Sequence, residues 1–193
     1  MTYKIAENVW FVGVKNPSLR VFDIIMRAEY GTSYNAYIVK GEKTALIECA
    51  HETYAGDFIN NIKSVIGGEK LDYIIFNHTE PDHSGCLYRL LELYPEVTVV
   101  SSPAANKYLK DITNMDFGSR IVKNGDVLDL GGTELKFIQA PFLHWPDSMF
   151  TYLADRNMLF SCDFLGAHFC DNGIFDTDVK KPELYDGQFE YYY

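Results

Sequence analysis

Short apolar runs bounded by turn residues dominate the first half of the chain, and this pattern is typical of β-strands. The clearest example is Leu71-Asp-Tyr-Ile-Ile-Phe76, where the apolar residues are nearly continuous, as they are in a buried strand. We therefore expect strands at residues 9–14, 20–25, 35–39, 44–48, 73–76 and 97–100.

Three segments between these strands space their apolar residues as helices do. Residues 55–66 stop at Gly67-Gly68, which is a common way for a helix to end. Residues 84–94 set leucines on one face before Pro95, and a third, shorter helix is expected at residues 103–110. The first half of the chain therefore alternates strands with helices.

The second half returns to strands, which are joined by short turns at Gly131-Gly132 and Asp155-Arg156-Asn157. Because hairpin-linked strands are antiparallel, this mixture favours a layered αβ sandwich over a purely wound βαβ sheet. The expected strands are residues 127–130, 134–140, 149–153 and 158–162.

The length of 193 residues and the 47% hydrophobic content fit one domain, which we expect to span residues 1–193. The last residues, YDGQFEYYY, stop where another apolar strand or helix begins. We expect either a naturally short chain or a protein with a further segment downstream.

Composition and charge exclude several classes of function. The net charge of -10, with acidic and basic residues interspersed, excludes a nucleic-acid partner, which would require a cationic stripe. The chain has no long apolar run and no signal peptide, so we expect no membrane partner and a cytoplasmic location. The four cysteines form no CxxC pair and are expected to be reduced thiols.

Four groups with metal-ligand chemistry follow the run that ends at Phe76, in the stretch FNHTEPDHSG. His78, Glu80 and Asp82 are two residues apart and can project to the same side, while the adjacent His83 can point to a neighbouring metal centre. Imidazole and carboxylate groups crowded in this way need a cation, and they suit zinc, iron or manganese. The alternative is a solvated turn in which Asp82 or Ser84 caps the following helix. The candidate ligands are His78, Glu80, Asp82 and His83.

Two more candidates occupy equivalent places, directly after expected strands. His144 lies in APFLHWPDS and Asp163 lies in LFSCDFLGAH. Taken alone, the histidine could be a packed residue beside Trp145 and the aspartate a turn former. Together with the first cluster, they predict a binuclear metal site built from three strand ends.

These residues resemble a known family. The pattern His-x-Glu-x-Asp-His at 78–83, followed by His144 and Asp163, is similar to the metallo-β-lactamase-like domain of flavodiiron proteins, also called A-type flavoproteins. Further similarities are VWFVGVKNPSLRVFD, GTSYNAYIV and DFLGAH, so the resemblance spans essentially the whole chain. It implies an α+β fold, the metallo-β-lactamase-like αββα sandwich, here without its C-terminal portion and without a flavodoxin-like domain.

The resemblance also implies the metals and their ligands. His78, Glu80 and His144 are expected to bind one iron, Asp82 and His83 the other, and Asp163 to bridge them. Hydrolases of this superfamily carry His-x-His-x-Asp-His and bind zinc; Glu80 replaces the second histidine and favours iron, with zinc as a possible substitute. Family members complete the second iron with a histidine about sixty residues beyond the aspartate, a position that this sequence does not contain.

The implied activity is reduction of O2 or nitric oxide to water or nitrous oxide. Electrons are expected from the FMN of a flavodoxin-like partner domain, bound head to tail in a homodimer, or from a rubredoxin-like donor. His168 matches a family residue near the irons and is expected to donate a proton, unless it is a packed core histidine. Three alternatives are a flavin-free O2 or NO sensor, a zinc hydrolase, and a split gene product that is inactive alone.

Overall fold

The apolar runs of the first half form a seven-stranded sheet in this computed structural model, which describes residues 1–192 and leaves Tyr193 outside the described residues. Strands β8 to β11 run parallel to one another, and the other neighbours are antiparallel. The order across the sheet is β1 (Tyr3–Ala6), β2 (Val9–Phe11), β7 (Tyr37–Lys40), β8 (Thr44–Ile47), β9 (Tyr73–Phe76), β10 (Thr98–Ser101) and β11 (Gly118–Ile121).

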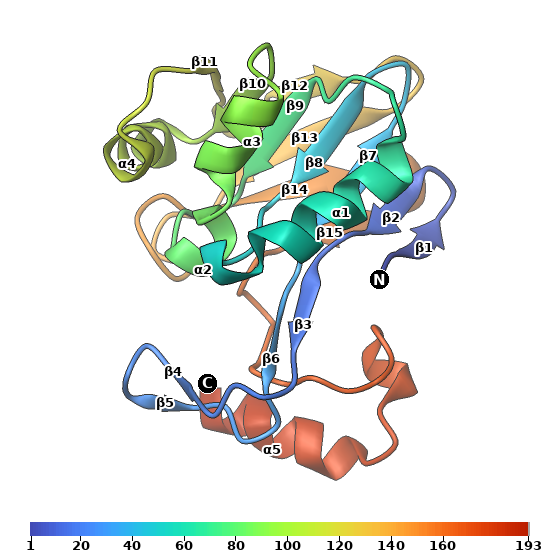
Figure 1. The fold of residues 1–193 in the computed structure, drawn as a ribbon, viewed down its shortest axis with the longest axis vertical. Helices are drawn as coiled ribbons and strands as arrows, with labels where there is room; N and C mark the ends of the chain where they lie inside the picture. The colour runs from blue at the N-terminus through green and yellow to red at the C-terminus, as the bar shows by residue number, and fades with distance from the viewer. Residues whose placement is uncertain (193) are drawn as a thin grey trace. The chain divides into compact units, whose positions relative to one another are not determined.

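Helices lie against one face of this sheet (Figure 1). The expected helix at residues 55–66 is confirmed as α1 (Ala55–Ile66), which buries Phe58, Ile62 and Ile66, spaced four residues apart, and ends at Gly67. Helix α4 (Pro103–Thr113) begins where Ser102 Oγ accepts a hydrogen bond from the Ala105 N–H at 3.1 Å.

The helix expected at residues 84–94 is found as the slightly shorter α3 (Leu87–Leu93), and a separate short helix, α2 (Pro81–Ser84), precedes it. Gly85 lies at the break, and the backbone there is tightly packed. A Cβ atom at residue 85 would lie 2.6 Å from the Pro81 carbonyl oxygen and 2.7 Å from the Glu52 nitrogen. The close approach of the 3₁₀ turn η1 (Glu52–Tyr54) therefore explains why glycine separates the two helices.

The second half forms a four-stranded antiparallel sheet, as its hairpin turns predict. Leu135, Phe137, Met149 and Leu153 are buried and pack in one hydrophobic core with residues of the first sheet. The layers are thus helices, the seven-stranded sheet and the four-stranded sheet. The strands are β12 (Val127–Asp129), β13 (Glu134–Gln139), β14 (Met149–Leu153) and β15 (Met158–Phe160), with the 3₁₀ turn η2 (Ala154–Arg156) before the last.

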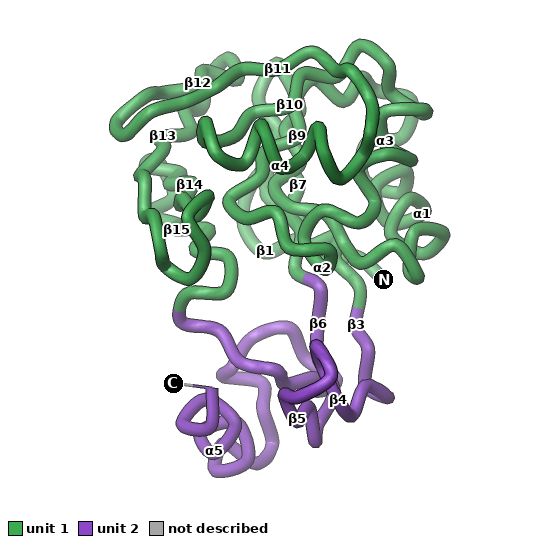
Figure 2. Tube along the Cα trace, turned by 90° about the vertical axis from the view of Figure 1, so that its left-hand side faces the viewer, with its two compact units in different colours: residues 1–14, 35–164 green, residues 15–34, 165–193 purple. Residues whose placement is uncertain are grey.

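Contacts divide the chain into two compact units (Figure 2). The first contains residues 1–14 and 35–164, and therefore both large sheets. The second contains residues 15–34 and 165–193, of which the structure describes all but the last. A single functional domain over residues 1–193 stays a prediction.

The second unit contains small strand pairs and a helix. Residues 20–25 are not the single strand that we expected, because Asp23 and Ile24 have φ values of 45° and 72° and form a turn. Lys15 Nζ donates hydrogen bonds to the carbonyls of three consecutive residues, 171 to 173, at 2.6 to 3.0 Å. The elements are β3 (Val14–Asn16), whose first residue belongs to the first unit, with β6 (Thr32–Tyr34), β4 (Val21–Phe22) with β5 (Met26–Arg27), η3 (Asp176–Asp178) and α5 (Pro182–Tyr192).

None of the helices in residues 1–192 combines the length and the apolar character needed to cross a membrane.

Candidate metal centre

The candidate ligands of the first unit come from loops that follow three strands. His78 and Glu80 lie between β9 and α2, His144 lies between β13 and β14, and Asp163 follows β15. Asp82 and His83 lie within α2, whose first residue is Pro81. Ends of strands that share a core hold such loops on a rigid base, and here they bring the ligands together.

Buried polar contacts fix the loop after β9. Asn77 is fully buried and links both sheets: its Nδ2 donates to the Phe160 carbonyl at 3.1 Å, and its Oδ1 accepts from Thr151 Oγ1 at 2.7 Å. Ser84 Oγ donates to the Thr79 carbonyl at 2.8 Å and to the Glu80 carbonyl at 3.1 Å. These contacts hold the loop that carries His78 and Glu80.

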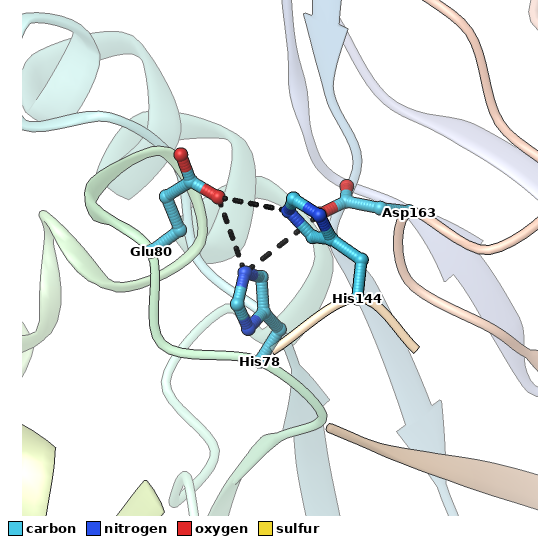
Figure 3. A group of neighbouring side chains, drawn as sticks. All are labelled: His78, Glu80, His144 and Asp163. Carbon is cyan, nitrogen blue, oxygen red and sulfur yellow. Dashed lines mark hydrogen bonds and ion pairs between the residues drawn. The ribbon is translucent and has the colours of Figure 1, made fainter. Parts of the chain in front are cut away.

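One group of ligand atoms comprises His78, Glu80, His144 and Asp163, all within 4.8 Å of one another (Figure 3). Glu80 Oε2 lies 3.2 Å from His78 Nε2 and 3.4 Å from His144 Nε2. Asp163 Oδ2 lies 3.9 Å from His78 Nε2. The His144 side chain is 52% exposed, whereas His78 and Glu80 are buried, so this group is open on the side of His144.

A second group comprises Asp82, His83 and Asp163. His83 Nε2 lies 2.9 Å from Asp163 Oδ1 and 3.3 Å from Asp82 Oδ2. The two carboxylate oxygens of Asp163 thus face different groups, Oδ1 toward His83 and Oδ2 toward His78. All six ligands that the sequence predicts lie in these two groups, and their coordination of metal stays a prediction.

Sequence reasoning missed Asp147, which is fully buried beside His78. Its carboxylate oxygens lie 3.2 and 3.3 Å from His78 Nδ1, and Oδ2 accepts a hydrogen bond from Thr79 Oγ1 at 2.8 Å. Ser102 Oγ, which caps α4, donates to the Asp147 carbonyl at 2.9 Å. The segment that supplies His144 therefore also supplies an acceptor that can fix the orientation of His78.

The electrostatics of the metal-free site are those of paired opposite charges. Burial would lower the pKa of His78, but hydrogen bonds to Asp147 and Glu80 outweigh it and raise the pKa to about 9. Burial would raise the pKa of Asp163, but the charge of His83 and its hydrogen bond outweigh it and lower the pKa to about 2. His78 and Asp163 are thus each stabilised in their charged form by partners of opposite charge.

The carboxyl group of Asp147 shows the same balance. Burial would raise its pKa, and the hydrogen bonds and charge of His78, together with the Thr79 hydroxyl, lower it below the usual value. Asp147 therefore remains an acceptor for the Nδ1 proton of His78, which leaves Nε2 as the nitrogen that faces Glu80.

His168, the residue expected to donate a proton, belongs to the second unit. There its Nδ1 lies 3.0 Å from Thr32 Oγ1, and its ring lies 4.5 Å from the ring of Phe22 and 5.6 Å from that of Tyr192. These contacts describe a packed histidine within that unit. The catalytic role of His168 stays a prediction.

Comparisons with known proteins agree with this fold. A family model described as ODP family beta lactamase matches residues 32–185. The flavo-diiron protein FprA2 of Clostridium acetobutylicum is 53% identical over 192 residues, covering 98% of this chain and 48% of that protein. The type A flavoprotein fprA of Rhodobacter capsulatus is 37% identical over 193 residues, covering 98% of this chain and 44% of that protein.

Solved structures give the same result. The rubredoxin oxygen:oxidoreductase of Desulfovibrio gigas has a TM-score of 0.95 at 31% identity, covering all of this chain and 48% of that one. The flavodiiron protein of Giardia intestinalis has a TM-score of 0.93 at 27% identity, and the match covers 100% of this chain and 47% of that chain. The chain spans about half the length of the relatives it matches. The expected metallo-β-lactamase-like fold is thereby confirmed, and the chain belongs to the flavodiiron protein family, whose N-terminal metallo-β-lactamase-like domain it represents.

Proposed function

We propose that this chain is a di-iron oxidoreductase domain that reduces O2, nitric oxide or both, to water or nitrous oxide. His78, Glu80 and His144 would hold one iron, Asp82 and His83 the other, and Asp163 would bridge them. Family membership supports the proposal, and so does a relative whose name is rubredoxin oxygen:oxidoreductase.

The observation that carries the proposal is Glu80, a buried carboxylate whose oxygen lies between two imidazole nitrogens, at 3.2 and 3.4 Å. A carboxylate is a harder, anionic donor, which suits iron better than the imidazole found at this place in zinc hydrolases. The donors also fit two cations, because the carboxylates of Glu80, Asp82 and Asp163 balance most of their positive charge.

Two ferrous ions would supply electrons and open positions for one small gas molecule. The residues of the chain would orient the ligands, hold the two metal positions together and leave an approach for the substrate. Asp147 would keep His78 in one tautomer, and Asp163 would hold the two positions together through its separate oxygens. The exposed side chain of His144 would leave an approach for gas and electrons.

Electrons would come from a flavodoxin-like domain carrying FMN, or from a rubredoxin-like protein. The flavoprotein and rubredoxin names of the relatives support these donors. A homodimer would bring the flavin of one subunit to the metals of the other. His168 would donate a proton, and residues 1–193 would act as one metallo-β-lactamase-like domain.

Iron loading followed by gas consumption tests this function. Protein reconstituted anaerobically with ferrous iron is expected to retain two irons per chain, to show ferric absorption after oxidation, and to consume O2 or nitric oxide over many turnovers with a reduced flavodoxin or rubredoxin. Glu80→Gln keeps the shape and removes the charge, so we expect it to lose most of the iron and the activity.

Two results would contradict the proposal. Tight retention of two zinc ions, with no reaction toward either gas and hydrolysis of a thioester or lactone, would indicate a hydrolase. A stable gas adduct with a single turnover, even with excess electron donor, would indicate a sensor.

The affinity for iron is expected to increase as the pH rises from 6 to 9. His78 must lose a proton to bind a metal, and its pKa in the metal-free protein is about 9. Below that pH, protons compete with the metal; above it, the competition ends. Competition with a chelator at several pH values measures the change, and proton release in weak buffer provides a second reading. An affinity that stays constant between pH 6 and 9 would contradict a ligand role for a His78 whose pKa is about 9.

A further inference from the structure

A third group of potential ligands lies on the other side of the His83 ring, and it comprises Glu48, His83 and Cys162. We call it the thiol nest. His83 Nδ1 lies 3.4 Å from Glu48 Oε2 and 3.4 Å from Cys162 Sγ, while Nε2 of the same ring faces Asp163 at 2.9 Å. The three ligand atoms of the nest lie within 4.8 Å of one another.

Glu48 leaves one oxygen directed into the thiol nest. The side chain is 3% exposed, and its Oε1 accepts a hydrogen bond from the Asn77 N–H at 2.7 Å. Within residues 1–192, Oε2 is a buried atom without a hydrogen bond, and the group that faces it is the His83 ring, whose Nδ1 lies 3.4 Å away. A buried carboxylate oxygen in that state is costly unless a cation or a strong donor faces it.

The charge of the thiol nest suits a divalent cation. The Glu48 carboxylate is 3% exposed, and this carboxylate together with a Cys162 thiolate would need a counter-charge. A divalent ion with one carboxylate, one thiolate and one neutral imidazole forms a complex with no net charge, which a buried site tolerates best. On binding, the S–H bond of Cys162 and the Nδ1–H bond of His83 break, bonds from sulfur and nitrogen to the metal form, and both protons leave to solvent.

We propose that the thiol nest is a binding site for a thiophilic divalent cation of the zinc class, held by Glu48 Oε2, His83 Nδ1 and Cys162 Sγ. Sulfur, nitrogen and carboxylate oxygen are the donors of protein zinc sites. The sulfur donor distinguishes this site from the two groups described above, which contain only nitrogen and oxygen ligands.

Sharing of His83 makes the thiol nest a competitor of the second iron position. A neutral imidazole has a single free lone pair, so a cation at Nδ1 leaves Nε2 protonated. Zinc in the thiol nest would therefore remove a ligand from the pair formed by Asp82 and Asp163. This consequence rests on the proposed function, whereas the site itself rests on the geometry of its three ligands.

Cobalt and zinc, added without iron, test the site separately from the proposed activity. The metal-free protein with Co2+ is expected to show a thiolate-to-cobalt charge-transfer band, and X-ray absorption of the protein saturated with Zn2+ is expected to show sulfur at about 2.3 Å. Cys162→Ser should abolish both signals. Cys170→Ser is the matched control, since Cys170 lies in the second unit, and it should keep both.

Two outcomes would overturn the proposal. A charge-transfer band that persists in Cys162→Ser would place the sulfur ligand elsewhere. A zinc shell of nitrogen and oxygen alone in the unaltered protein would show that Glu48 and Cys162 only accept or donate hydrogen bonds to His83. Because the zinc measurement needs no variant, it decides the question even if Cys162→Ser unfolds, and gas consumption by the iron-loaded protein does not enter either result.

Discussion

Replacement of Asp163 by alanine is expected to empty both iron positions at once. Its Oδ1 lies 2.9 Å from His83 Nε2, and its Oδ2 faces His78 Nε2 at 3.9 Å, so one side chain serves two groups of ligands. Removal would also leave two positive ions close together without the carboxylate between them. We expect the affinity for each iron to fall by at least about 100-fold, because loss of an outer-shell partner alone costs 10- to 100-fold.

The measurement is iron content per chain after anaerobic loading and gel filtration. Asp116→Asn is a suitable control, because Asp116 is exposed and far along the chain from the ligands, and it should retain full iron. Asp163→Asn keeps the shape without the charge and should give an intermediate loss. Retention of two irons by Asp163→Ala would mean that the carboxylate is not the bridge, and the assignment of both groups would fail.

Much of the fold could be predicted because local patterns agree with the final packing. Helix α1 has the expected bounds, since its apolar face and its terminal glycine are both local signals. The hairpins of the second sheet follow from Gly131-Gly132 and from the turn before β15. Such elements need no knowledge of the rest of the chain.

The errors occur where tertiary contacts decide the structure. Strand β11 (Gly118–Ile121) is exposed along its length and lacks an apolar pattern, yet it pairs with β10 at the edge of the sheet. Residues 20–25 have a strand-like composition, but Ile24 is 94% exposed and lies in a turn. The break at Gly85 depends on the η1 turn, which comes more than thirty positions earlier in the chain.

The candidate site likewise contains residues that local sequence signals predict and a residue that only tertiary contacts reveal. The six candidate ligands could be predicted from the sequence, because four have local spacing and two directly follow expected strands. Asp147 could not, since its partner His78 is 69 positions away and an aspartate after proline looks like a turn residue. The one local signal was its place three residues after His144 in the same segment. Groups that orient ligands are defined by contacts, and spacing alone does not reveal them.

Replacement of Asp147 by asparagine is expected to weaken metal binding at the position of His78 by about 10- to 100-fold, the usual cost of altering a carboxylate behind a ligating histidine. The amide keeps the volume of the buried side chain but removes its charge, and it can present an N–H to Nδ1 instead of an acceptor. The ring orientation and the tautomer of His78 would then no longer be fixed.

Two measurements separate this positioning role from a general loss of stability. In the metal-free protein, histidine NMR titration should show the pKa of His78 falling from about 9 toward its ordinary value, because Asp147 is one of the two hydrogen-bond partners that raise it. Thr79→Val is the matched control: it removes the hydroxyl that donates to Asp147 at 2.8 Å without touching the charge, so both the pKa and the metal affinity should change less. If Asp147→Asn lowers the melting temperature but leaves the pKa of His78 and the metal affinity unchanged, then Asp147 supports the loop and does not act on the ligand.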